Sequence, residues 1–175
     1  MIEIRVHGRG GQGSVTTVSL LAIAAFHDNK FSQAFPSFGP ERGGSPVIAL
    51  ARIDDKEINL RSDVYEPDIL IVLDPSLVKD IDVIKGLKKN GIIILNSQKK
   101  IKIKSFKTYS VDATGLALKT LGKPIINTAL LGAFSKITKI ISLNAFEKAI
   151  EEYFHNKPNL IEPNKKLIKN VYEKS

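Results

Sequence analysis

A glycine-rich segment near the N-terminus carries the residue types best suited to binding an anion. Residues 8–13 run Gly-Arg-Gly-Gly-Gln-Gly, and a helical pattern begins directly after them at Ser14. Glycines allow tight turns and close approach of a ligand to the backbone, while the first N–H groups of a helix are unpaired and partly positive. Arg9 adds a full charge and Gln12 an amide. We therefore predict an anion-binding loop made of Arg9, Gly10, Gly11, Gln12, Gly13 and Ser14.

One alternative for this loop is a dinucleotide site, because Gly8, Gly10 and Gly13 fit the G-x-G-x-x-G spacing. That fold needs a second strand soon after the first helix, ending in an acidic residue that holds the ribose. Here the helix leads into a proline- and phenylalanine-rich segment, and we predict no strand there. This missing context disfavours NAD or FAD, and the absence of G-K-[ST] disfavours a P-loop. A free-standing dinucleotide-binding module is kept as an alternative.

The segment that follows the first helix, residues 30–46, is the second candidate binding loop. It holds three prolines, three glycines and three phenylalanines without a regular period. Long irregular loops in compact domains are usually functional or packed against something. We expect aromatic anchors for a subunit contact, and Glu41 and Arg42 either order the loop, pair with a neighbouring subunit or form only a local ion pair. The candidate interface or active-site residues are Phe35, Phe38, Gly39, Pro40, Glu41, Arg42, Gly43 and Gly44.

Some chemistries are disfavoured by composition. The sequence has no cysteine, so it offers no disulfide, thiol nucleophile or cysteine ligand for zinc or an iron–sulfur cluster. Its histidines, His7, His27 and His155, are far apart and form no metal-ligand pattern. We predict no metal site, expect a structural role for His7, and find no nucleophile or acid–base pair.

The charge of +8, from 26 basic and 18 acidic residues, suits an anionic cofactor, an acidic partner subunit or nucleic acid. Lysines concentrate in residues 98–107, where they alternate with isoleucines. We interpret this segment as a strand with one solvated face and a protected edge. No aromatic platform interleaves with the lysines as single-strand binding requires, so we predict no nucleic-acid partner. With no bilayer-length apolar run and no signal-peptide pattern, we expect a soluble cytoplasmic protein.

The remaining pattern defines the elements that would position these loops. We predict a single domain over residues 1–175, of the α/β class, with a three-layer α/β/α sandwich and a mixed, mostly parallel, Rossmann-like sheet. A hairpin over residues 47–62 would supply the antiparallel part. Ligands of such folds bind beyond the carboxyl ends of the strands, where residues 8–13 lie. The other expected strands are 2–7, 68–74, 91–97 and 107–113, and the expected helices are 14–27, 76–87, 114–122, 128–138, 142–154 and a final segment punctuated by Pro158 and Pro163.

Several motifs together resemble the gamma subunit of the 2-oxoacid:ferredoxin oxidoreductases, and most of all the pyruvate synthase group. They are GRGGQG, FSQAFPSFGPERGGSPV, YEPDILIVLDPSL, NTALLGAFSKI and KPNLIEPNKKLIKNVYE. The resemblance therefore covers essentially the whole chain. Gly43 departs from it, because many pyruvate-type members have a second arginine at that place.

The resemblance implies one subunit of a cytoplasmic heterotetramer with alpha, beta and delta partners. Such enzymes decarboxylate pyruvate on thiamine diphosphate with magnesium, form acetyl-CoA from coenzyme A, and reduce ferredoxin through [4Fe–4S] clusters. It also implies that this chain holds no cofactor and is inactive alone, and that Arg9, Gln12 and the backbone of residues 10–14 face coenzyme A. Another 2-oxoacid (2-oxoglutarate, 2-oxoisovalerate or indolepyruvate) is an alternative substrate, and a homodimer is an option for the isolated chain.

Overall fold

The sheet is built around its first strand. The computed structural model describes residues 1–37 and 43–175, and strand β1 (Ile2–Arg9) pairs antiparallel with β3 on one side and parallel with β4 on the other. The six strands lie in the order β2-β3-β1-β4-β5-β6, with β5 and β6 continuing the parallel half. The other strands are β2 (Phe31–Ser37), β3 (Pro46–Asp54), β4 (Ile69–Val72), β5 (Ile92–Asn96) and β6 (Lys107–Val111).

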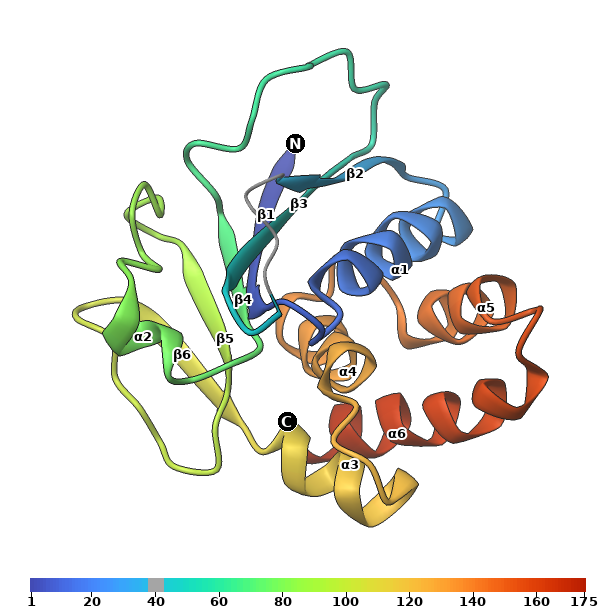
Figure 1. Cartoon of the computed structure of the whole chain (residues 1–175). Coiled ribbons are helices and arrows are strands. Elements are labelled where there is room, and N and C mark those ends of the chain that lie inside the picture. Colours follow the sequence, from blue (N-terminus) through green and yellow to red (C-terminus); the bar gives the residue numbers. More distant parts are fainter. Residues whose placement is uncertain (38–42) are drawn as a thin grey trace.

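Most helices cover one face of this sheet (Figure 1). Apolar residues of β1, β3 and β4 pack there against the helices in the larger core, which includes the fully buried Phe134 and Phe146. Burial of such apolar area is the main stabilising term of the fold. The helices on this face are α1 (Ser14–His27), α3 (Ala113–Leu121), α4 (Ile126–Thr138), α5 (Leu143–Tyr153) and α6 (Ile161–Lys174), with the short 3₁₀ helix η1 (Pro158–Leu160) before α6.

The opposite face has a thinner cover. A second cluster joins Leu70, Val72, Ile93 and Leu95 of β4 and β5 to apolar side chains from the connecting segments, and the helix on this side is the short α2 (Leu77–Asp80). Because β4 is covered on both faces, all its residues are buried, as expected of a central parallel strand. The predicted mixed α/β sandwich is thus confirmed, with two unequal outer layers.

The predicted hairpin over residues 47–62 is wrong. Residues 58–62 form no strand, and β3 pairs antiparallel with β2, which lies within the segment expected to be irregular. Strand β2 is at the edge of the sheet, where a proline is tolerated. A second strand therefore does follow α1. It is not a parallel neighbour of β1, so the topology still lacks the dinucleotide-fold context.

The lysine-rich segment and the helix after β4 also differ from prediction. Residues 98–106 form a loop with one isolated bridge between Ile103 and Phe106, and β6 begins only at Lys107. Ile101 and Ile103 turn onto the second core cluster, so their alternation with lysine reflects a partly buried loop. Helix α2 ends at Asp80, because Ile81 is already extended.

Capping chemistry is seen at some of the helix ends. Ser142 or Asn144 was expected to cap α5, and the side chain of Ser142 accepts a hydrogen bond from the N–H of Ala145. Gly122 ends α3 with φ +67°. Asn127 was expected to be the N-cap of a helix over residues 128–138, but α4 begins two residues before that range, at Ile126, and no side chain caps it. Within the described residues, no helix is both long and apolar enough to span a bilayer.

Candidate functional site

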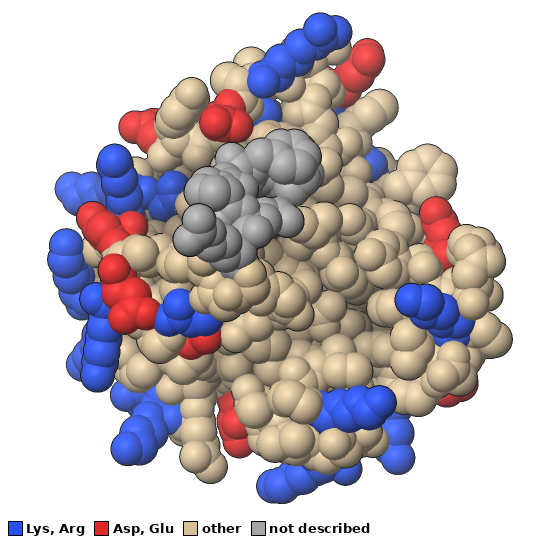
Figure 2. Space-filling view, viewed as in Figure 1, with Lys and Arg blue, Asp and Glu red and all other residues tan. Residues whose placement is uncertain are grey.

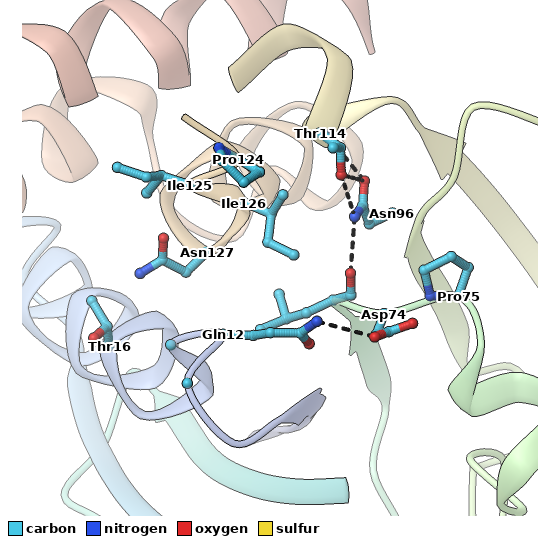
Figure 3. Close-up of a pocket in the computed structure, with 13 residues that line it drawn as sticks. Gln12, Thr16, Asp74, Pro75, Asn96, Thr114, Pro124, Ile125, Ile126 and Asn127 are labelled. Carbon is cyan, nitrogen blue, oxygen red and sulfur yellow. Dashed lines mark hydrogen bonds between the residues drawn. The ribbon is translucent and has the colours of Figure 1, made fainter. Parts of the chain in front are cut away.

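A polar pocket of about 690 Å³ lies at the carboxyl ends of β1, β4 and β5. The N-terminal ends of α1, α3 and α4 meet around it (Figure 3). Such convergence places several partly positive helix ends at one cavity, which favours an anionic ligand. The polar residues that line it are Gln12, Thr16, Asp74, Asn96, Thr114 and Asn127.

The glycine loop forms one wall of the pocket, and Gly13 is the position that requires glycine most strictly. Its φ is +84°, and a Cβ atom there would lie 2.6 Å from Nδ2 of Asn127 in α4. A side chain would therefore be strained in φ and would also collide with the neighbouring helix. Gly11 has φ +94° with open space around it. Glycine is therefore favoured there by the backbone conformation of the turn and not by lack of space.

The start of α1 offers several unpaired backbone donors. The first hydrogen bond of the helix runs from the N–H of Thr17 to the carbonyl of Gly13, at 2.9 Å. Among the described residues, no acceptor pairs with the N–H groups of residues 13–16, and no side chain caps this helix. These amides are available to an anionic ligand.

Arg9 is bound within the chain. Its guanidinium donates to Asp74 at 3.1 Å, to Ser76 Oγ at 2.7 Å and to the carbonyl of Gly44 at 3.2 Å, and it also pairs with Asp80. This arrangement fixes the loop against the end of β4, and the one positive charge of Arg9 compensates part of the combined charge of Asp74 and Asp80. The predicted contact between Arg9 and a ligand stays a prediction, and Arg9 has a bracing role in the chain itself.

Gln12 and Asp74 complete this brace. Gln12 accepts from the N–H of Arg9 at 2.8 Å and donates to Asp74 at 3.0 Å (Figure 3). Burial acts to raise the pKa of Asp74, but hydrogen bonds from Ser76 and Gln12 and the charge of Arg9 outweigh it and lower the pKa. Asp74 is thus ionised at neutral pH. It was not among the predicted site residues, although its place at the end of an apolar strand was a usable signal.

Asn96 is a second pocket residue that sequence reasoning missed. It ends β5 and donates to the carbonyl of Leu73 and to Thr114 Oγ1, each at 2.9 Å, while its Oδ1 accepts from the N–H of Thr114 (Figure 3). One amide therefore ties β4, β5 and α3 together at the pocket floor. Its position after the buried strand was the signal available in the sequence.

The structure brings the two predicted loops together. The N–H of Gly10 donates to the carbonyl of Ser45 at 2.9 Å, and the N–H of Gly44 donates to the carbonyl of Gly10 at 3.3 Å. Gly43 is exposed beside them. The predicted residues Phe38, Gly39, Pro40, Glu41 and Arg42 lie outside the described residues.

Phe35, the other predicted aromatic anchor, is half-buried in β2. Its ring packs 5.5 Å from the guanidinium carbon of Arg52, which is fully buried. Arg52 in turn pairs with Glu3 at 3.0 Å and donates to the carbonyls of Ser62 and Asp63. Phe35 therefore has a contact inside this chain, and its role in a subunit contact stays a prediction.

His7 lies under the loop and is almost fully buried. Its Nε2 accepts from Nε of Arg5 at 3.0 Å. Burial, followed by the nearby charge of Arg5, lowers the pKa of His7 to about 3. A neutral ring hydrogen-bonded inside the sheet layer fits the structural role expected for it. In residues 1–37 and 43–175, no three acidic or histidine side chains are grouped as metal ligands.

The fold and site together define a mixed α/β domain with a pocket at the carboxyl edge of its sheet. The sequence model of the pyruvate ferredoxin/flavodoxin oxidoreductase family matches residues 3–174. The chain therefore belongs to the pyruvate ferredoxin/flavodoxin oxidoreductase family, and within it corresponds to the gamma type of oxidoreductase subunit.

Individual relatives agree with this assignment. The chain is 52% identical to pyruvate synthase subunit PorC of Methanocaldococcus jannaschii, over 98% of this chain and 96% of that protein. It is 50% identical to the pyruvate/ketoisovalerate oxidoreductases common subunit gamma of Thermococcus kodakarensis, over 100% and 97%. The crystal structure of a pyruvate oxidoreductase subunit from Thermotoga maritima matches with a TM-score of 0.85 and 37% identity, over 98% of this chain and 95% of that one. The predicted resemblance is confirmed.

Proposed function

We propose that this chain is the gamma subunit of a pyruvate:ferredoxin oxidoreductase complex and that its pocket receives coenzyme A. The complex would convert pyruvate, coenzyme A and two oxidised ferredoxins to acetyl-CoA, CO2, one proton and two reduced ferredoxins. The observation that carries the proposal is the 52% sequence identity to a pyruvate synthase subunit over 98% of this chain. The unpaired helix amides beside a cavity at the edge of the sheet support it.

In this proposal the cofactors belong to alpha, beta and delta partner subunits. The 175 residues contain no cysteine that could bind a [4Fe–4S] cluster, and magnesium finds no ligand cluster among the described residues. In the partner subunits, thiamine diphosphate would supply the electron sink that decarboxylation of a 2-oxoacid needs. The contribution of this chain is to bind and orient coenzyme A beside that centre.

Each pocket residue has a distinct part in that binding. Of residues 13–16, Gly13 and Thr16 line this pocket, and Ser14 and Val15 line a smaller cavity on the other side of the loop. Their unpaired amides donate to the pyrophosphate of coenzyme A, and Thr16 and Asn127 add further polar groups in the pocket. Arg9 and Gln12 keep the loop in place and offset the charge of Asp74. The carboxylate that lines the pocket is thus partly compensated where the anion approaches.

The 2-oxoacid is selected by other chains in this proposal. The Thermococcus kodakarensis relative is a common subunit gamma of pyruvate and ketoisovalerate oxidoreductases, so such a subunit is compatible with two acids. A complex for 2-oxoisovalerate, 2-oxoglutarate or indolepyruvate is therefore the second candidate. Assaying the co-purified complex with each acid decides between them, and the proposal expects the highest kcat/KM with pyruvate.

The role of the loop is tested by the variant Arg9→Ala in the assembled complex. Removal of the guanidinium exposes Asp74 and Asp80 at the pocket, so the KM for coenzyme A should rise about 3- to 10-fold, equivalent to roughly 1 kcal/mol. The KM for pyruvate and thiamine diphosphate binding should not change. The double variant Arg9→Ala/Asp80→Asn should recover part of the coenzyme A affinity. Unchanged KM for coenzyme A and unchanged turnover in Arg9→Ala would contradict the proposal.

A further inference from the structure

A second cavity adjoins the pocket on the side of β5 and α3. It has a volume of about 810 Å³ and shares Pro75, Asn96 and Thr114 with the first. The two cavities therefore lie side by side at the end of β5. A ligand longer than either one could occupy both.

The second cavity, here called the lysine crevice, is positively charged. Lys79, Lys99 and Lys100 line it, and within the described part of the chain none of the three forms a salt bridge. One carboxylate, that of Asp112, also lines the crevice. Asp112 is the N-cap of α3 and accepts a hydrogen bond from the N–H of Gly115 at 2.9 Å. The crevice thus carries a net positive charge that nothing in the described residues compensates.

The backbone that carries two of these lysines is held in place. Ser97 Oγ donates to the carbonyl of Lys99 at 2.8 Å and accepts from the N–H of Lys99 at 3.2 Å. The N–H of Ile101 donates to Ser110 Oγ of β6 at 3.0 Å. Basic side chains are frequent on this side of the molecule with acidic ones among them, whereas the surface over α1 and α4 is largely uncharged (Figure 2). These hydrogen bonds hold the backbone of Lys99 and Lys100 at the edge of the crevice.

We propose that the lysine crevice binds the 3′-phosphate of coenzyme A. The inference rests on the proposed function, because it assumes that the pyrophosphate lies at the amides of residues 13–16. Coenzyme A carries its 3′-phosphate and its pyrophosphate on one ribose, and the structure offers two adjoining cavities, one with unpaired amides and one with three cations. Lysine ammonium groups suit a phosphomonoester dianion as point charges. The crevice then makes the subunit selective for coenzyme A over analogues that lack this phosphate.

The experiment compares coenzyme A with 3′-dephospho-coenzyme A in the assembled complex. Both the KM and the calorimetric Kd are measured for the wild type and for the variant Lys79→Gln/Lys99→Gln/Lys100→Gln. The wild type should prefer coenzyme A by about tenfold or more, as expected for one well-formed charged contact. The triple variant should lose most of that preference while its affinity for 3′-dephospho-coenzyme A stays the same.

A matched control is available on the neighbouring surface. The variant Lys102→Gln/Lys104→Gln/Lys107→Gln removes the same charge from residues that do not line the crevice, and it should keep the wild-type preference. An equal loss of affinity for both ligands in the crevice variant would show general electrostatic attraction and overturn the inference, as would an equal effect of the control. If Arg9→Ala still weakens coenzyme A binding while the crevice variant changes nothing, only the crevice assignment is wrong. If neither Arg9→Ala nor the crevice variant weakens coenzyme A binding, the proposed function is wrong as well.

Discussion

At the residue scale, Gly13 links the shape of the loop to the pocket, because its backbone has φ +84° and its Cα lies against Asn127. Replacement by alanine should destabilise the folded chain by about 1–3 kcal/mol, through φ strain and the collision with Asn127. Gly11→Ala meets strain without collision and should lower stability by about 1–2 kcal/mol. Denaturant unfolding measures both, and an equal loss of stability in the two variants would contradict the role given to Asn127.

His7 gives a prediction about pH. Its pKa is about 3 in the folded chain and about 6.5 when unfolded, so the unfolded chain binds more protons between these values. Stability from the neutral ring is therefore present above about pH 6.5 and is lost as pH falls toward 3. Between pH 7.5 and 5.5 the free energy of unfolding should fall by about 1 kcal/mol on account of this residue.

The control for this pH dependence uses an exposed histidine. His7→Gln should remove about 1 kcal/mol of the pH-dependent loss, whereas His155→Gln, at an exposed position, should retain it. Denaturant titrations at the two pH values supply the comparison. The assignment to His7 is refuted by an undiminished pH dependence in His7→Gln.

At the element scale, the helical layer depends on a close crossing of α4 and α6. A Cβ atom on Gly132 would lie 2.3 Å from the carbonyl oxygen of Ile168, so Gly132→Ala must push the helices apart. We expect a loss of about 1–3 kcal/mol in the free energy of unfolding, despite the better helix propensity of alanine. Gly43→Ala, with open space around it, should be nearly neutral. Wild-type stability in Gly132→Ala would show that α6 can shift freely.

The elements also show which parts of the fold the sequence could predict. The apolar runs that became β4 and β5 were identified correctly because burial on both faces leaves an unambiguous pattern. Strand β2 was missed because its partner, β3, lies later in the chain, and edge strands carry little periodicity of their own. The lysine-rich loop was predicted to be a strand because its two isoleucines, which both face a core cluster, alternate with lysines as residues of a half-buried strand do.

The site was predicted in part for similar reasons. The glycine loop has a local signature, and the structure places it at the sheet edge as expected. Asp74 and Asn96 were missed because they matter only through partners distant in sequence, such as Arg9 and Thr114. The pairing of Arg9 inside the chain was likewise invisible, since a loop arginine looks available until its neighbours are known.

At the scale of the whole molecule, the chain should act only within a complex. We expect it to co-purify with brown, cysteine-rich partner subunits when the complex is isolated, because the proposed reaction needs iron–sulfur clusters that this chain has no cysteine to bind. Gel filtration with absorbance in the visible range checks this. A colourless chain that binds NAD on its own in calorimetry would instead support the dinucleotide module.

The central claim is that coenzyme A binds at the start of α1, and hydrogen exchange of the assembled complex tests it most directly. The amides of residues 13–16 have no acceptor among the described residues, so they should exchange rapidly without ligand and slow down when coenzyme A is added. Pyruvate alone should leave them unchanged. Slowing of exchange in residues 11–17 on addition of coenzyme A is the predicted result, and protection confined to the partner subunits would contradict it.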